Sequence, residues 1–170
     1  MGLLSATIPL LTLNYTSAAT AAVALPGALN SMADLGVPTT SKRLVFSSGM
    51  GMGGMGGGMM SFLIDGKSFD PSRVDLTSRV NEIEQWTIEN RSSMDHPFHL
   101  HGTQFQVLSR SRGGVTVAEP FLAWRDTVNV AALETVVFKV VQRQLGRRMY
   151  HCHILEHESQ GMMGVLEVVA

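Results

Sequence analysis

MYHCHILEHESQGMM, residues 149–163, is the stretch on which the interpretation of the whole sequence depends. It holds three of the six histidines of the chain, and Cys152 is the only cysteine among 170 residues, which excludes an internal disulfide. Successive side chains of a β-strand point to opposite faces. On a strand, His151 and His153 would therefore share one face, and Cys152 would point to the other. This spacing predicts a strand that serves two metal centres, one on each side.

A second histidine cluster, HPFHLHG, spans residues 96–102. His99 and His101 are also two positions apart and can share a face, whereas His96 precedes a proline, is pushed to extended geometry and need not face the same way. Histidines with ordinary packing roles would be scattered along the chain. Because all six fall in two short clusters, the pattern indicates metal binding.

The two clusters supply two different sets of ligands. The first set combines two imidazoles, a thiolate and a thioether: His96, His157, Cys152 and Met162. This is the ligand set of a blue-copper electron-transfer site with a weak axial methionine. The second set has four imidazoles, suited to copper that meets oxygen: His99, His101, His151 and His153. The alternatives are coincidental clustering or a zinc site, but zinc prefers four strong ligands and gains little from a thioether.

The remaining pattern is one of short apolar runs separated by turn residues, with no long helical period. It predicts an all-β antiparallel sandwich or Greek-key barrel of about eight strands. An Asp-Gly pair within residues 61–70 predicts a hairpin. The other expected strands are residues 43–48, 82–90, 104–111, 126–131, 134–142, 147–153 and 164–170.

Length and charge limit the classes of function. The chain is long enough for one domain and part of another, and its formal net charge of −1 gives no reason to expect nucleic acid or an anionic membrane as a partner. No charged residue occurs in residues 1–33, so a signal peptide would lack its basic start, and polar residues from Asn14 onward interrupt any membrane span. We interpret residues 8–15 as a strand followed by a linker. Residues 1–40 would then end a preceding domain, and residues 41–170 would form the C-terminal one.

Together these motifs resemble the two copper-binding signatures at the C-terminal end of multicopper oxidases, a group that includes laccases and bacterial cuprous oxidases. That family is built from cupredoxin domains, and the resemblance implies that this chain is the last of them, with a cupredoxin-like Greek-key β-sandwich. The similarity covers about residues 40–170. It rests on the segments HPFHLHG, HCHILEHESQGMM, FLIDGKSFDP, FLAWRDTVNV and, from the end of the preceding domain, IPLLTLNY.

The resemblance also implies a role for each ligand. His96, Cys152 and His157 would bind type 1 copper, with Met162 axial. His99 would bind type 2 copper, and the type 3 pair would be held by His101, His151 and His153. Electrons from a phenol, an amine or Cu(I) would enter through exposed His157 or His96, pass along Cys152, and reduce dioxygen to water. Glu158 matches an acidic residue that assists proton delivery, and otherwise is a solvated loop carboxylate. Met94 resembles a position that handles cuprous substrate, and otherwise is a rim residue.

One departure from the family pattern is decisive for activity. The trinuclear cluster of the family takes eight histidines, and only four are available here. We therefore expect the isolated monomer to be inactive and to need a partner, either the N-terminal domains of the oxidase or a second copy of the chain. The family also implies a periplasmic or extracellular location.

A Gly/Met-rich run, residues 49–60, carries five methionines and seven glycines. Thioethers favour cuprous ion, so the run is interpreted as a flexible Cu(I)-collecting loop, against the alternative of a linker with incidental methionines. Two other functions remain open at this point: a stand-alone blue-copper electron-transfer protein, and a copper-binding or storage protein. The former has no use for the second set of histidines, and the latter does not need the Cys-His-Met spacing.

Overall fold

The computed structural model describes residues 11–14, 24, 27, 31–50 and 60–170. The chain divides into two units, Met1–Ser31 and Met32–Ala170. In the first unit, residues 11–14 are the described part of the strand expected at residues 8–15, and they are not assigned to a strand. The other residues of that segment lie outside the described part, so the assignment of residues 1–40 to a preceding domain stays a prediction. No helix in the described ranges is long and apolar enough to cross a membrane.

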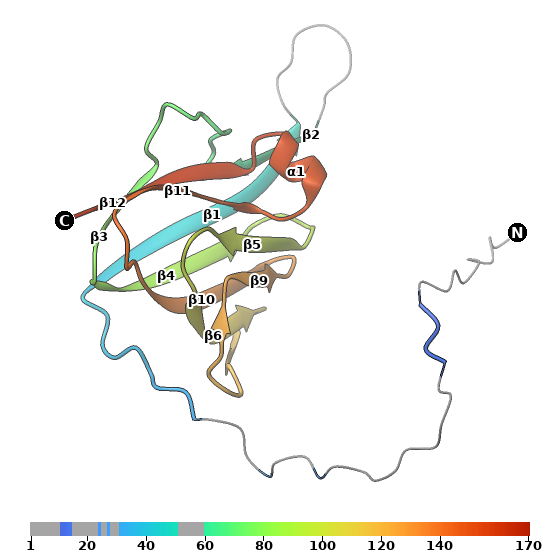
Figure 1. Ribbon diagram of the computed structural model, residues 1–170. Helices are drawn as coiled ribbons and strands as arrows, with labels where there is room; N and C mark the ends of the chain where they lie inside the picture. Colours follow the sequence, from blue (N-terminus) through green and yellow to red (C-terminus); the bar gives the residue numbers. More distant parts are fainter. Residues whose placement is uncertain (1–10, 15–23, 25–26, 28–30, 51–59) are drawn as a thin grey trace, which may run out of the picture. The chain divides into compact units, whose positions relative to one another are not determined.

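In the described part of the second unit, two β-sheets pack face to face, with one short helix (Figure 1). Sheet A has the order β2-β1-β4-β10-β6-β7, and β8 also pairs with β6. Its strands are β1 (Thr40–Met50), β2 (Met60–Ile64), β4 (Ile83–Asn90), β6 (Phe105–Arg112), β7 (Val115–Ala118), β8 (Trp124–Arg125) and β10 (Glu134–Val141). Sheet B has the order β3-β12-β11-β5-β9. Its strands are β3 (Leu76–Arg79), β5 (His96–Leu100), β9 (Thr127–Val130), β11 (Gly146–Cys152) and β12 (Met163–Val169).

The strand pattern predicted an antiparallel sandwich, but two of the observed strand pairings are parallel. β1 pairs with β4 in parallel, and β12 pairs with β3 in parallel. The reason is that β3 lies in sheet B, so the chain crosses from sheet A to sheet B and back before β4 returns beside β1. Antiparallel neighbours can be joined by a tight turn, whereas parallel ones need such a crossover. Local sequence patterns carry no signal for it.

The Asp-Gly pair forms the expected tight turn but not a long hairpin. Asp65 and Gly66 both have positive φ, 52° and 71°, and Ile64 and Lys67 exchange two backbone hydrogen bonds of 3.0 and 3.1 Å. These are the features of the turn that Asp-Gly favours. Beyond this single bridge the following residues leave the sheet, because β2 pairs with β1 instead. The run 49–60 thus begins and ends on paired strands, with Met50 opposite Met60, while residues 51–59 lie outside the described part.

An aromatic cluster fills the space between the sheets and fixes the strand that carries the first histidine cluster. Phe98 of β5 stacks on Phe138 of β10 with ring centroids 5.7 Å apart, and Phe138 in turn stacks on Phe105 at 4.3 Å. All three side chains are fully buried. Since each buried aromatic ring removes a large apolar area from water, this contact holds β5 against sheet A and fixes which face of β5 points inward.

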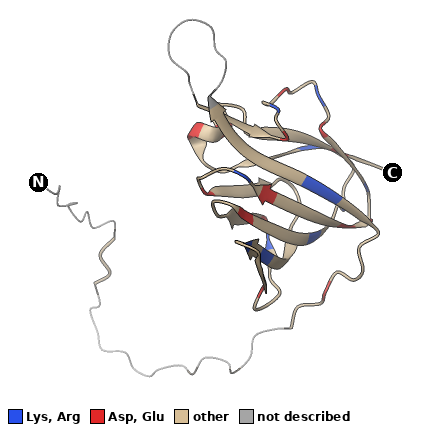
Figure 2. Ribbon diagram, turned by 180° about the vertical axis from the view of Figure 1, so that it is seen from behind, with Lys and Arg blue, Asp and Glu red and all other residues tan. Residues whose placement is uncertain are grey.

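A buried carboxylate joins the two sheets at another point. Glu84 of β4 accepts hydrogen bonds of 2.8 Å from Ser78 of β3 and from the indole of Trp86, and it pairs with Lys42 of β1. A buried charge is tolerated when it is paired and hydrogen-bonded. Elsewhere, basic and acidic residues are interspersed along the described strands (Figure 2), and several of them pair across strands, such as Arg147 with Glu167.

Candidate metal centre

The strands β5 and β11 are neighbours, and their register sorts the ligand-type residues onto two faces. Cys152 is opposite Phe98, and His151 is opposite His99. Phe98 points into the core, so Cys152 lies on the inner face of sheet B, and His151 and His99 lie on its outer face. The alternation of β5, buried at residues 96, 98 and 100, likewise places His96 on the inner face. The period of two therefore separates the candidate ligand residues onto two faces, as the sequence predicted.

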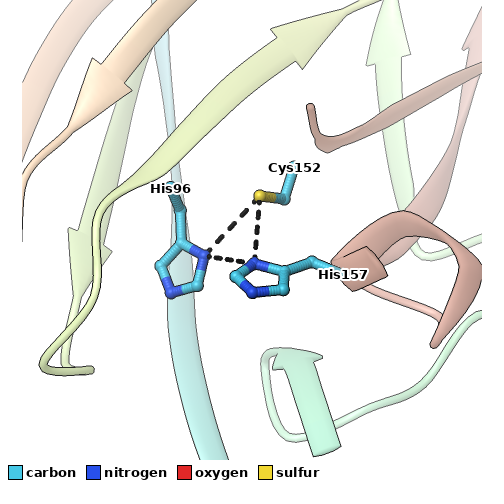
Figure 3. Close-up of side chains that lie close together, drawn as sticks. All are labelled: His96, Cys152 and His157. Atoms are coloured by element: carbon cyan, nitrogen blue, oxygen red, sulfur yellow. Dashed lines mark hydrogen bonds between the residues drawn. The ribbon is translucent and has the colours of Figure 1, made fainter. Parts of the chain in front are cut away.

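Three donor atoms converge on the inner face: those of His96 from β5, Cys152 from β11 and His157 from α1 (Leu155–Ser159) (Figure 3). The Sγ of Cys152 lies 3.6 Å from Nδ1 of His96 and 3.6 Å from Nδ1 of His157, and the two Nδ1 atoms are 3.1 Å apart. The point equidistant from the three atoms is about 2.0 Å from each, the length of a metal bond to imidazole nitrogen and close to that for thiolate sulfur. The donor set and its spacing therefore fit one metal ion, and a trigonal His2Cys set is typical of blue copper.

The short helix α1 is the element that brings His157 to this place, and no helical period in the sequence predicts it. After α1, Gly161 adopts φ 94°, a conformation suited to glycine. This turn returns the chain to sheet B, where the backbone N–H of Met162 donates to the His157 carbonyl at 2.9 Å and the Met162 carbonyl accepts from the Cys152 N–H at 3.1 Å. Met162 is fully buried and is bonded through its backbone to two of the three convergent residues.

Burial sets the protonation of the three groups in the metal-free chain. It raises the pKa of the Cys152 thiol to about 11, and together with the neighbouring His157 it lowers the pKa of His96 to about 4. Burial also lowers the pKa of His157. Both imidazoles are therefore neutral at pH 7, with lone pairs available to a metal, while the thiol keeps a proton that a metal must displace.

His96 is oriented by a buried polar network that sequence reasoning missed. Its Nε2 lies 2.7 Å from the hydroxyl of Ser92, which is also 2.8 Å from the side-chain oxygen of Asn90. The hydroxyl can donate to Asn90 and accept from Nε2–H, which leaves Nδ1 of His96 free to face Cys152. Both side chains are buried, with 0% of His96 and 3% of His157 exposed. The expectation that electrons enter through an exposed His157 or His96 was therefore wrong about their exposure. The chain packs over both rings, and no local sequence signal reports that packing.

A second group lies on the outer face of sheet B: His99, His101 and His151, whose ligand atoms all lie within 4.8 Å of one another. Nε2 of His101 is 2.9 Å from Nε2 of His151. The other nitrogen of His151 lies 3.0 Å from the Cys152 carbonyl, and Nδ1 of His99 lies 3.0 Å from both the Asp126 carbonyl and the Thr127 hydroxyl. These acceptors place the proton on Nδ1 of His151 and His99, and each Nε2 keeps its lone pair for a metal.

Two further predicted residues lie beside this group. His153 comes directly after β11 and is exposed, and its ring centroid is 5.5 Å from those of His99 and His151, so it is near the group but outside its tight core. A carboxylate oxygen of Glu158 is 3.4 Å from Nδ1 of His151. Met94, two residues before His96, is 39% exposed.

A cavity of about 560 Å³ opens beside the second group. Its lining includes His99 itself and, from other parts of the chain, Leu35, Trp124, Asp126 and Arg143. Sequence patterns could not locate this cavity, because its walls come from separate segments that only the fold brings together. Of the outer-face histidines, His99 is therefore accessible from this side of the domain.

A β-sandwich with a buried His2Cys centre defines a cupredoxin-like domain with a candidate copper site. Comparison with known proteins agrees with this class. The family model of the multicopper oxidases matches residues 39–170, and the chain belongs to the multicopper oxidase family.

Similar proteins include a multicopper oxidase of Staphylococcus aureus, 46% identical over 109 residues. That match covers 62% of this chain and 24% of the relative, so the chain spans about a quarter of that protein. Among solved structures, a multicopper oxidase from Campylobacter jejuni, described as a metallo-oxidase, matches with a TM-score of 0.79 and 43% identity over 86% of this chain and 33% of its own. A laccase from Pediococcus acidilactici matches with a TM-score of 0.72 and 37% identity, covering 87% of this chain and 31% of its own.

Proposed function

We propose that this chain is the copper-binding C-terminal domain of a laccase-like oxidase, which takes electrons from a small reductant and delivers them to dioxygen. The reductant would be a phenol, an amine or Cu(I). The observation that carries the proposal is the pair of ligand groups on the two faces of β11. Cys152 belongs to the inner group, and the adjacent residue His151 belongs to the outer one.

Each predicted ligand has a role in this proposal. His96, Cys152 and His157 would hold type 1 copper with Met162 as axial ligand, and His99 would hold type 2 copper. The type 3 ligands would be His101, His151 and His153. Bound copper would supply one-electron redox chemistry, from the reductant at type 1 to dioxygen, which is reduced to water, at the trinuclear centre.

The chain's own groups would provide the path and the protons. The peptide bond between Cys152 and His151 links the inner ligand group covalently to the outer one. The carboxylate of Glu158, 3.4 Å from Nδ1 of His151, is placed to hold a proton beside the outer group. Both inner imidazoles are buried, and electrons would enter the inner group across the ring of His157 or His96.

The outer group would be only half of a trinuclear site, because the chain has four histidines for it and the family uses eight. The cavity beside His99 leaves this face open to a partner that supplies the rest. That partner would be the N-terminal domains of the oxidase or a second copy of this chain, and the isolated monomer would not reduce dioxygen. A periplasmic or extracellular location stays a prediction, which cell fractionation would test.

Copper stoichiometry, visible absorption and EPR of the purified chain test the proposal together. We expect one copper with a strong blue band per monomer, and no dioxygen consumption. Cys152→Ser should abolish the blue band, whereas the matched variant His101→Ala should keep it, since His101 belongs to the outer group. Absence of a blue band from the copper-loaded wild type would contradict the proposal. A monomer that carries type 2 and coupled type 3 signals would refute the proposal that the chain supplies only half of the trinuclear site.

The stand-alone electron-transfer protein remains the main alternative. Three histidines with ligand atoms within 4.8 Å on the outer face argue against it, because a shuttle has no use for them. The two functions differ in one measurement. Mixed with the N-terminal domains of a related oxidase, a domain of the proposed kind gains dioxygen reduction, and a shuttle does not.

A further inference from the structure

The two imidazoles of the inner group are restrained in different ways. His96 is held at its distal nitrogen by the 2.7 Å contact with the Ser92 hydroxyl. Among the residues that the structure describes, no hydrogen bond reaches the distal nitrogen of His157, whose Nδ1 faces Cys152 and His96. An imidazole without such a partner can rotate about its χ2 torsion, which is broad. Some other contact must therefore hold the ring of His157 in place.

That contact is an aromatic ring from a distant part of the sequence. Phe62 of β2 stacks on His157 with ring centroids 3.6 Å apart and an interplanar angle of 22°. The same ring meets His96 edge-on at 6.3 Å and 67°. Phe62 is 6% exposed, and β2 and α1 lie at the same end of the sandwich (Figure 1). Phe62 thus covers one face of the His157 ring and also borders the second imidazole.

We propose that Phe62 is a positioning residue of the inner metal centre: by stacking on His157, it keeps Nδ1 directed at the point shared with Cys152 and His96. This inference rests on the proposed copper function of the site. The stacked ring preorganises His157, because a side chain already held in its binding orientation loses less rotational freedom when the metal binds. Without the stacked ring, His157 would sample orientations in which Nδ1 points away from the shared point.

The test compares variants of the full chain that remove the ring or keep it. Phe62→Leu removes the aromatic face, and Phe62→Tyr keeps it. Phe105→Leu is the matched control, because Phe105 is a buried phenylalanine too but stacks on Phe138 at 4.3 Å rather than on an imidazole. For each variant, circular dichroism checks folding, competition with a chelator measures copper affinity, and absorption and EPR report the geometry of the site.

We expect Phe62→Leu to bind copper about three- to tenfold more weakly than Phe105→Leu does, the factor that corresponds to the loss of one aromatic pair. Its blue band and EPR hyperfine splitting should shift, and Phe62→Tyr should restore wild-type values. Equal affinity and equal spectra in Phe62→Leu and Phe105→Leu would overturn the proposal.

Two further results are distinguishable from that outcome. If Phe62→Leu does not fold, Phe62→Ile takes its place, and loss of the fold in both would also overturn the inference, since Phe62 would then serve the core rather than the ligand. A wild-type chain without a blue copper signal would instead refute the proposed function on which the inference rests. The wild-type spectrum therefore separates the two failures.

Discussion

Copper binding should release one proton from Cys152 at neutral pH. Burial raises the pKa of this thiol to about 11, while His96, with a pKa of about 4, is already neutral at pH 7. Metal binding needs the thiolate. The difference of about four units between the thiol pKa and pH 7 corresponds to about 5 kcal/mol of binding free energy spent on deprotonation. That energy decreases as the pH rises, because the thiol then loses its proton more easily.

The perturbation is Cys152→Ser, which removes the titrating sulfur and keeps a side chain of similar size. Under anaerobic conditions, Cu(I) is titrated in competition with a coloured chelator of known affinity between pH 6.5 and 8.5. For the wild type we expect the apparent affinity for Cu(I) to rise about tenfold per pH unit, because binding displaces the proton of the Cys152 thiol. The serine variant should be weaker and lack this slope. The outer histidines are common to both proteins, so the difference between the two slopes isolates Cys152.

If the apparent Cu(I) affinity rises equally with pH in the wild type and in Cys152→Ser, the prediction that Cys152 releases the proton is refuted. That result would mean either that Cys152 is not a ligand or that its thiol is already ionised in the metal-free chain. Calorimetry in two buffers of different ionisation enthalpy distinguishes these cases, because it counts the protons released. One proton per copper supports the buried thiol, and a value near zero contradicts it.

Three further predictions concern the stability of the metal-free chain, measured by urea unfolding. Glu84→Ala should lower the free energy of unfolding by about 3 kcal/mol or more, because it breaks a buried, hydrogen-bonded ion pair. Glu167→Ala removes an exposed pair and should lower it by less than about 1 kcal/mol, and equal losses in the two variants would contradict this prediction. Gly161→Ala should lower the free energy of unfolding by about 1–3 kcal/mol more than Gly114→Ala, because both glycines have positive φ but only a Cβ at position 161 would meet other atoms, the nearest at 2.1 Å. Indistinguishable urea midpoints for the two variants would argue against that clash. The pKa of His96 falls on folding from 6.5 to about 4, so in this pH range the unfolded chain binds one more proton than the folded chain. About 3 kcal/mol of stability that is present above pH 6.5 should therefore be lost as the pH falls toward 4. If His96→Gln loses stability with acid as the wild type does, His96 is not the cause.

Much of the candidate site could be predicted from local spacing. The two-residue period of a strand separates Cys152 from His151 whatever the rest of the fold is, because neighbouring side chains of an extended chain point to opposite faces. The register observed between β11 and β5 agrees with this separation. The Asp65-Gly66 turn was likewise a local property, since these residues tolerate positive φ at low cost.

Other features of the site could not be predicted, because they depend on segments far apart in the sequence. The helix α1 has five residues, too few for a periodic pattern, yet it carries His157 to the inner group. Ser92 and Phe62 have no motif of their own. Their roles appear only when β2 and the segment between β4 and β5 are packed around the two imidazoles.

The sequence by itself therefore determined which side chains can bind metal and how they divide between two faces, since both follow from residue type and strand period. The tertiary structure alone decided that the inner group closes into a triangle with sides of 3.1, 3.6 and 3.6 Å, that its imidazoles are buried, and that a phenylalanine stacks on one of them. The physical reason is that these properties arise from packing between strands and a helix distant in sequence. Burial and distance are set by the whole sandwich, and no short stretch of sequence encodes them.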